Sequence, residues 1–333
     1  MKNEFPQPQL KVYTNSSPIE NRAVREEAVR LLMVTDFSPS AEHAESRAAM
    51  LSMELDYQPL EIMAIIGSDA LPDAGPRKLL EVGDAEQESV GDIECGLRDV
   101  ATRLGKWEKL AYICSIRFGN PVAGIVDRAE EMDAFITVIG SYGGSIAANL
   151  TRGYSTIDVA RATTRPILVV KQEPSQSYGK VLIASDFSEA SIQTALTAVR
   201  VAPDAEFEFL HVIEDARLVT ISSEVESNES RLERRIEDER IARSRLANLI
   251  EELDMNAERV SVVVRHGFPS SVIHARSKEI DADLVACGKQ ACSDAYNPSL
   301  GSVAMGLLVQ SPCDVLMACS PGDKMRGFDK PAA

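Results

Sequence analysis

The chain has 333 residues, of which 44% are hydrophobic and 26% are charged. This length predicts two domains, because a single hydrophobic core seldom grows beyond roughly 250 to 300 residues, and the hydrophobic content excludes a wholly disordered chain. The formal net charge of −16 argues against sequence-independent binding to nucleic acid or to an anionic membrane surface, so we expect neither as a partner.

Short apolar runs alternate with helical patterns along the first half of the chain. After a polar N-terminal extension at residues 1–29, five apolar runs predict strands at 31–34, 61–66, 112–116, 135–139 and 167–170. Helices are predicted between them at 40–55 and 84–104, from Pro121 onward, and at 157–162. Because these strands are apolar throughout, we expect a sheet that is buried on both faces.

The second half repeats this alternation. Its strands are predicted at 181–184, 206–212, 260–264, 284–287 and 315–318. The clearest helix of the chain precedes the third of them, with charged residues around an apolar stripe made of Leu232, Ile236, Leu246, Ile250 and Leu253. We predict two doubly wound α/β domains at residues 30–171 and 180–319, joined by a linker at 172–179 and followed by a C-terminal tail at 320–333.

The two halves also repeat one another residue by residue. The segment 31–38 returns at 181–188, the segment 117–121 at 265–269, and the segment 134–140 at 282–288. A period of roughly 150 residues means duplicated domains, because the repeats of solenoid proteins are roughly 20 to 50 residues long. Chance similarity between apolar strands does not explain why charged, glycine and proline positions return in the same order.

Cysteine usage and the N-terminal sequence indicate a cytoplasmic protein. Six cysteines are too few for a disulfide scaffold and several lie in apolar runs, which is typical of thiols in a reducing compartment. Cys287 and Cys292 come nearest to a metal-binding pattern, but no histidine follows them at zinc-finger spacing, and we expect no protein-held metal site. The polar start lacks the apolar core of a secretory signal, and no apolar run approaches the roughly 20 residues of a membrane span.

A candidate ligand site follows the first and fourth strands of the first half. In open α/β sheets, ligands bind beyond the carboxyl ends of the strands where the strand order reverses. Glycines after the fourth strand would let the backbone approach a polyphosphate, and the amides and hydroxyls at the next helix start could donate to its oxygens. Asp36 would repel phosphate, so we expect it to accept a hydrogen bond from a ribose hydroxyl or to help hold a divalent cation. The alternative is an ordinary glycine-rich loop with a helix-capping aspartate.

Combined and ordered twice, these motifs resemble the universal stress protein family, whose nucleotide-binding members carry Gly, two residues, Gly, nine residues, Gly, then Ser or Thr. Residues 30–318 fit two tandem copies of that domain. The resemblance implies two Rossmann-like domains, each with a five-stranded, mainly parallel sheet flanked by helices. It also implies dimer-like pairing of domains, which we expect within the chain, and a homodimer stays open as a further form of pairing.

The resemblance implies that the nucleotide-binding residues are Thr35, Asp36, Ile65, Ile139, Gly140, Tyr142, Gly143, Gly153, Tyr154 and Ser155 in the first copy and Asp186, Val212, Gly288, Gly301 and Ser302 in the second. Each copy departs from the family pattern. Tyr154 stands where a small hydroxyl residue is expected, and Ala291 replaces the second glycine of the second copy.

The function implied by this resemblance is that of a stress-response protein. It would bind an adenine nucleotide as a non-catalytic sensor or regulatory module. This nucleotide would be AMP, or ATP together with Mg²⁺ or Mn²⁺. We expect no catalytic residues, because the sequence has no Gly-x-x-x-x-Gly-Lys loop and no convincing general base. Two alternatives stay open: a scaffold or dimerisation protein that binds no nucleotide, and an enzyme that hydrolyses ATP slowly.

Overall fold

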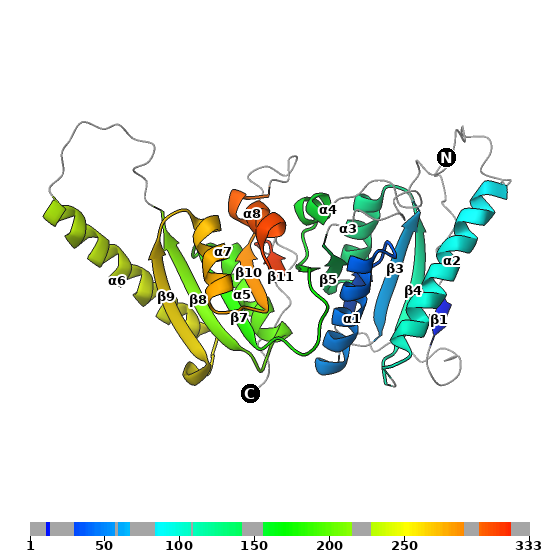
Figure 1. The fold of residues 1–333 in the computed structure, drawn as a ribbon, viewed down its shortest axis with the longest axis horizontal. Helices are drawn as coiled ribbons and strands as arrows, with labels where there is room; N and C mark the ends of the chain where they lie inside the picture. The colour runs from blue at the N-terminus through cyan, green and yellow to red at the C-terminus, as the bar shows by residue number, and fades with distance from the viewer. Residues whose placement is uncertain are drawn as a thin grey trace. The chain divides into compact units, whose positions relative to one another are not determined.

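The computed structural model describes residues 11–13, 30–56, 59–66, 84–107, 109–141, 156–214, 228–289 and 300–320. The chain divides into two compact units, Met1–Ser177 and Tyr178–Ala333. In each unit helices flank a sheet (Figure 1).

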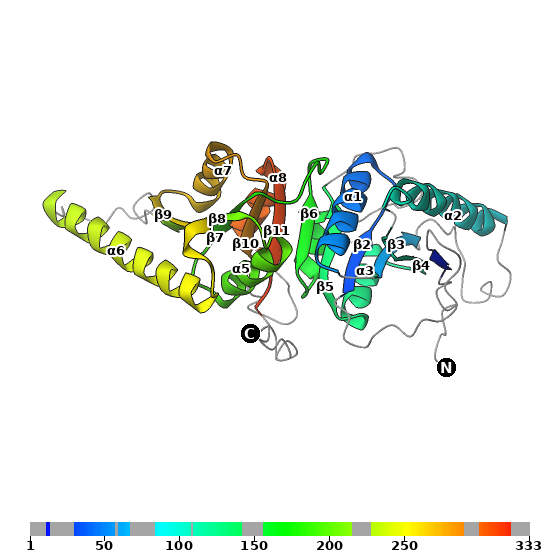
Figure 2. The same cartoon turned by 90° about the horizontal axis from the view of Figure 1, so that it is seen from below.

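The described residues of unit 1 form five parallel strands and one short antiparallel strand. The parallel strands are β2 (Arg30–Val34), β3 (Leu60–Ile66), β4 (Tyr112–Phe118), β5 (Ala134–Gly140) and β6 (Ile167–Val170). They lie in the order β4-β3-β2-β5-β6. The helices are α1 (Pro39–Glu54), α2 (Asp84–Leu104), α3 (Pro121–Glu131) and α4 (Thr156–Ala162). Figure 2 shows α1 and α2 over one face of the sheet and α3 over the other.

The described residues of unit 2 repeat the parallel arrangement with five strands of their own. These are β7 (Lys180–Ala184), β8 (Glu206–Ile213), β9 (Val260–His266), β10 (Leu284–Gly288) and β11 (Asp314–Ala318), in the order β11-β10-β7-β8-β9. The helices are α5 (Glu189–Val201), α6 (Asn228–Glu252), α7 (Pro269–Glu279) and α8 (Ser302–Gln310). The predicted fold, a five-stranded and mainly parallel sheet flanked by helices in each copy, is therefore confirmed.

One strand of unit 1 is missing from the sequence prediction. Strand β1 (Lys11–Tyr13) lies in the segment that was read as a polar extension, and it pairs antiparallel with β4 from Tyr112 to Cys114. Three residues are too few to show a period-2 pattern, so the sequence carried no signal for it.

The first helix of each unit starts immediately after the first strand because a serine caps it. Ser38 accepts a hydrogen bond from the amide of Ala41 at 3.2 Å, and a proline occupies the first turn of α1. Ser188 accepts in the same way from the amide of Ser191, also at 3.2 Å. Such caps satisfy one of the amides that a helix start leaves without an intrahelical acceptor. The strand-to-helix turn is thereby held close to the carboxyl edge of the sheet.

The apolar stripe predicted on α6 is buried or half-buried in its C-terminal half and exposed in its N-terminal half. Leu246 is fully buried, whereas Leu232 and Ile236 are 60% and 61% exposed. The reason is length: a helix of 25 residues spans about 37 Å, and the seven residues of β9 span about 23 Å. The N-terminal half of α6 therefore runs past the strands that its C-terminal half covers (Figures 1 and 2).

The core of unit 1 contains a buried hydroxyl without a hydrogen bond among the described residues, and its energetic cost can be measured. Thr137 in β5 is 1% exposed, and none of the described residues hydrogen-bonds to its Oγ1. We expect Thr137→Val to raise the free energy of unfolding by about 1 kcal/mol, because it removes an unsatisfied buried hydroxyl and keeps the shape of the side chain. Urea unfolding followed by the fluorescence of Trp107, the only tryptophan, measures unit 1.

A matched threonine provides the control for that prediction. Thr163 is 2% exposed, and its Oγ1 both donates to the carbonyl oxygen of Arg165 and accepts from the Arg165 amide. Thr163→Val should lower the stability of unit 1. Equal effects of the two valine substitutions would contradict the difference in hydrogen bonding.

Candidate functional site

The strand order of unit 1 reverses between β2 and β5, and that of unit 2 reverses between β7 and β10. Chain connections diverge at such a point, which makes the carboxyl ends of these strands the expected place for a ligand. Ile139 lies in register with Val34, and the amide of Thr35 donates to the carbonyl oxygen of Met63 at 3.0 Å. The predicted residues Thr35, Asp36, Ile139 and Gly140 thus come together at one edge of the sheet.

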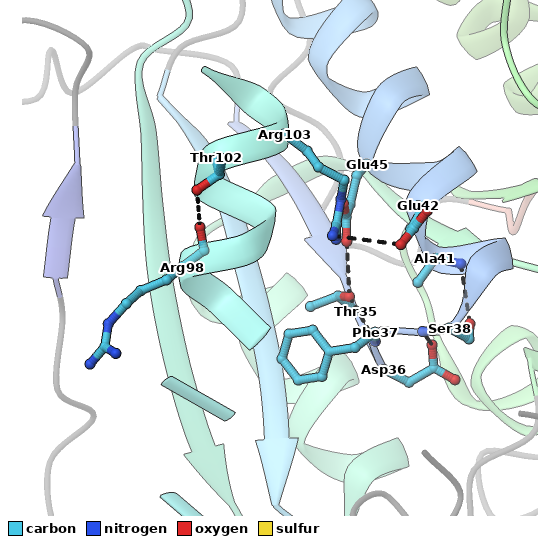
Figure 3. Close-up of polar contacts among 10 residues, drawn as sticks. All are labelled: Thr35, Asp36, Phe37, Ser38, Ala41, Glu42, Glu45, Arg98, Thr102 and Arg103. Carbon is cyan, nitrogen blue, oxygen red and sulfur yellow. Dashed lines mark hydrogen bonds and ion pairs between the residues drawn. The ribbon is translucent and has the colours of Figure 1, made fainter. Parts of the chain in front are cut away.

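The turn between β2 and α1 is built from the side chains of Thr35 and Asp36 (Figure 3). The Thr35 hydroxyl accepts from the amide of Phe37 at 3.0 Å, and Asp36 Oδ1 accepts from the amide of Ser38 at 3.0 Å. No described residue donates to Asp36 Oδ2. Asp36 is half-buried, and the turn fixes its Oδ1.

The same turn recurs between β7 and α5 in unit 2. The amide of Phe187 donates to the Ser185 hydroxyl at 3.2 Å, and Asp186 Oδ1 accepts from the amide and the hydroxyl of Ser188 at 2.9 and 2.5 Å. Burial opposes ionisation of Asp186, but the hydrogen bonds from Ser188 and Ser191 outweigh it and hold the pKa of Asp186 below its ordinary value. Asp186 is therefore a carboxylate at neutral pH.

The buried carboxylate of Glu45 supports the turn between β2 and α1. Glu45 of α1 is 2% exposed, accepts from the Thr35 hydroxyl at 3.2 Å, and accepts from Nε and Nη2 of Arg103 at 2.9 and 2.7 Å. Burial raises the pKa of Glu45 above its ordinary value, and the hydrogen bonds from Arg103 offset only part of this effect. Burial, together with the charge of Glu45, raises the pKa of the nearby Cys114 thiol to about 12, so this thiol is unreactive at neutral pH.

Close packing requires glycine at the ends of β5 and β10. A Cβ on Gly140 would lie 2.6 Å from backbone atoms of Ser40, and a Cβ on Gly288 would lie 2.7 Å from the amide nitrogen of Ser191. Both neighbours belong to the first turn of the helix that follows the first strand. These glycines were predicted to let the backbone approach a polyphosphate, whereas helix-to-strand packing already accounts for them.

The start of α4 contacts the end of β5 in unit 1. The hydroxyl of Thr156, the first residue of α4, donates to the carbonyl oxygen of Gly140 at 3.0 Å. In unit 2 the predicted residue Gly301 is the N-cap of α8 and offers no side-chain cap, and the exposed Ser302 is the first residue of that helix. The first amides of α8 are therefore without a side-chain acceptor from the cap, an arrangement that suits an anion.

Comparison with known proteins identifies the family of this chain. The family model described as "Universal stress protein family" matches twice, at residues 29–171 and 177–318. The chain belongs to the universal stress protein family. The comparison with curated proteins gives no significant match.

Solved structures of universal stress proteins share the fold. One from Archaeoglobus fulgidus is 19% identical and matches with a TM-score of 0.62, covering 89% of this chain and 100% of its own. A putative universal stress protein from Pseudomonas aeruginosa is 15% identical, with a TM-score of 0.53 and coverages of 88% and 94%. At these identities the likeness concerns the tandem α/β fold.

The remaining predicted positions of this universal stress protein lie in two groups. Ile65 and Ile139 are 2% and 3% exposed in the core of the sheet, and Val212 is half-buried near the end of β8. Five predicted residues fall outside the described part of the chain: Tyr142, Gly143, Gly153, Tyr154 and Ser155. Glu45, Arg103 and Phe37 were not predicted as residues of the site. For Phe37 a signal existed, because Phe187 repeats it in the second copy.

A metal cluster or a membrane span would change the class of this universal stress protein. Within the described ranges, no group of three or more histidine, cysteine, aspartate or glutamate side chains could hold a metal ion. No helix in the same ranges is both long and apolar enough to cross a bilayer.

Proposed function

We propose that this protein is a stress-response protein that binds an adenine nucleotide, ATP or AMP, as a non-catalytic sensor or regulatory module. The observation that carries the proposal is the duplicated aspartate turn. In each unit a carboxylate stands at the point where the strand order reverses, with one oxygen fixed by the amide of a serine two residues later. A turn that is repeated in both copies with the same hydrogen bonds is a feature that the duplication has kept.

The chemistry of the turn suits the sugar end of a nucleotide. An ionised carboxylate accepts hydrogen bonds from ribose hydroxyls, and it can ligate the Mg²⁺ or Mn²⁺ that accompanies ATP. In unit 2, the amides at the start of α8 and the exposed Ser302 can donate to phosphate oxygens. Asp186 would thus take the ribose or the cation, and the α8 start would take the phosphates.

The surroundings of the first turn favour binding without hydrolysis. A general base must reach the reacting water and must have a pKa suited to proton transfer. Burial does raise the pKa of Glu45, but this side chain is 2% exposed and hydrogen-bonded to both Thr35 and Arg103. Glu45 therefore has a structural role. The polar groups that the turn offers to a ligand are the carboxylate of Asp36, backbone amides and hydroxyls.

Substitution of the two aspartates tests this proposal. Asp36→Asn and Asp186→Asn keep an oxygen that can accept from the serine amide, and each removes the charge that faces the ligand. Losing one charge-assisted hydrogen bond or metal contact, roughly 1.5 to 3 kcal/mol, predicts ATP binding at least about tenfold weaker in the unit that binds. Isothermal titration of the full chain with ATP and Mg²⁺ measures the effect and shows which unit is used.

The same titration, together with an assay of phosphate release, distinguishes nucleotide binding from the scaffold and ATPase alternatives. Absence of heat with the parent protein would favour a scaffold that binds no nucleotide. Steady phosphate release at about 1 per second or faster, a rate typical of dedicated enzymes, would favour an ATPase. Stoichiometric binding without such turnover is the expected result.

A further inference from the structure

The residue after each aspartate adopts an unusual backbone conformation. Phe37 has φ of 59° and Phe187 has φ of 64°. This left-handed region is unfavourable for a bulky side chain, and such a conformation persists only where the surroundings hold it. The contacts of the two phenylalanine rings therefore determine whether each aspartate turn keeps its shape.

In unit 1 the ring of Phe37 is seated on helix α2. A Cβ on Gly96 would lie 2.8 Å from the ring, so the absence of a side chain at Gly96 is what makes room for it. Arg103, seven positions further along α2 and on the same face, donates to Glu45, which in turn accepts from Thr35. Helix α2 thus meets the Asp36 turn at two points, and Figure 3 shows the polar one.

In unit 2 the equivalent helix, α6, contacts the ring of Phe187 through different residues. The ring of Phe187 lies 4.5 Å from the ring of His211 of β8, and the guanidinium of Arg245 of α6 lies 3.9 Å from the centre of the Phe187 ring. His211 Nδ1 donates to the carbonyl oxygen of Ser185 at 2.8 Å. A cation over an aromatic face is an attractive contact. The second helix of each unit therefore holds the strained turn, through Gly96 in one case and Arg245 in the other.

We propose that α2 and α6 position the aspartate turns for ligand, with Gly96 and Arg245 as the positioning residues, so that ligand occupancy and the seating of these helices are coupled. The inference rests on the proposed nucleotide binding. Coupling of this kind is reciprocal: a ligand that favours the turn also favours the seated helix, and a change at the helix alters affinity for the ligand by the same factor.

Two glycines of α2 provide a matched test of this inference in unit 1. A Cβ on Gly91 would meet nothing within 4 Å, whereas one on Gly96 would overlap the Phe37 ring. Both alanine substitutions improve helix propensity, so a merely structural role predicts that both variants bind ATP like the parent. We expect Gly96→Ala to weaken ATP binding in unit 1 about tenfold and Gly91→Ala to leave it unchanged.

A readout without ligand keeps the inference separate from the proposed function. Hydrogen exchange of the Phe37 and Ser38 amides, followed by NMR on the full chain, should be about tenfold faster in Gly96→Ala than in Gly91→Ala, because both amides donate to side chains of the turn. If the parent binds no ATP, the proposed function is wrong and the exchange result alone decides on positioning. Equal exchange in the two variants overturns the inference.

Arg245→Met repeats the test in unit 2 without any steric overlap, and Arg240→Met on the same helix is its control, since Arg240 is exposed and paired with Glu237. Exchange of the Phe187 and Ser188 amides should be faster only in Arg245→Met. Exchange that is the same in both arginine variants contradicts positioning by α6.

Discussion

Gly140→Ala is expected to destabilise unit 1 by about 3 kcal/mol, at the upper end of the usual cost of overpacking. The added Cβ would lie 2.6 Å from the carbonyl carbon and oxygen of Ser40 and 2.9 Å from the amide nitrogen of Ala41. These are backbone atoms in the first turn of α1, so the overlap can be relieved only by moving the helix start. Urea unfolding followed by Trp107 fluorescence measures the loss, because this lone tryptophan belongs to unit 1.

Two other glycines supply the controls. Gly91→Ala adds its methyl to open space on α2 and should stabilise unit 1 slightly. Gly288→Ala should act on unit 2 in the way that Gly140→Ala acts on unit 1, and it should leave the Trp107 transition unchanged while lowering the transition seen by circular dichroism. A Gly140→Ala protein that unfolds like Gly91→Ala would show that the helix start yields easily, and glycine at position 140 would then need another explanation.

The parallel strands of both units and the helices of the first half were predictable because their signals are local. The run that forms β5 is apolar throughout, and Asn120 with Pro121 marks the start of α3 through a side-chain cap and a fixed φ. The second copy repeated the strand pattern of the first. The duplication also placed Asp36 and Asp186 at equivalent turns, which is why the carboxylates at the edge of each sheet could be named from the sequence.

What the sequence could not supply depends on contacts between distant elements. Gly96 reads as a weakness in a helix, and only the packing of α2 against Phe37 shows why glycine occupies that position. The exposure of Leu232 depends on the length of α6 relative to β9, which the apolar stripe does not encode. The partner of Glu45 lies 58 positions away at Arg103, so no local pattern indicates this ion pair.

Removing an arginine from the buried ion pairs should have the largest effect on stability. Glu61 of β3 is 4% exposed, accepts from Arg128 Nε at 2.8 Å and Nη2 at 2.5 Å, and also accepts from the Ser115 hydroxyl at 2.8 Å. The hydrogen bonds that Arg128 donates to Glu61 raise the pKa of Arg128 above its ordinary value. Arg128→Met would leave a buried carboxylate without its counter-charge, and we expect unit 1 to lose about 3 to 5 kcal/mol. The Trp107 transition in urea measures it.

The duplication provides the comparison in unit 2. Glu208 of β8 is 7% exposed and accepts from Arg276 Nε and Nη2 at 2.7 and 2.6 Å, so Arg276→Met should destabilise unit 2 to a similar extent. Arg98→Met removes an exposed partner of Glu94 at 3.4 Å and should change stability by less than about 1 kcal/mol.

A double substitution tests whether the Glu61–Arg128 ion pair itself stabilises unit 1. The alternative is that Arg128 is needed only because a buried Glu61 carboxylate without a counter-charge is unfavourable. If the cost of Arg128→Met comes from the carboxylate that it leaves behind, then Glu61→Met combined with Arg128→Met should recover most of the lost stability. The recovery should be incomplete, because the Ser115 hydroxyl would lose its acceptor in a site where it is 2% exposed. A double variant no more stable than Arg128→Met would instead mean that the pair itself holds α3 on the sheet, and that both units keep it for the energy it contributes.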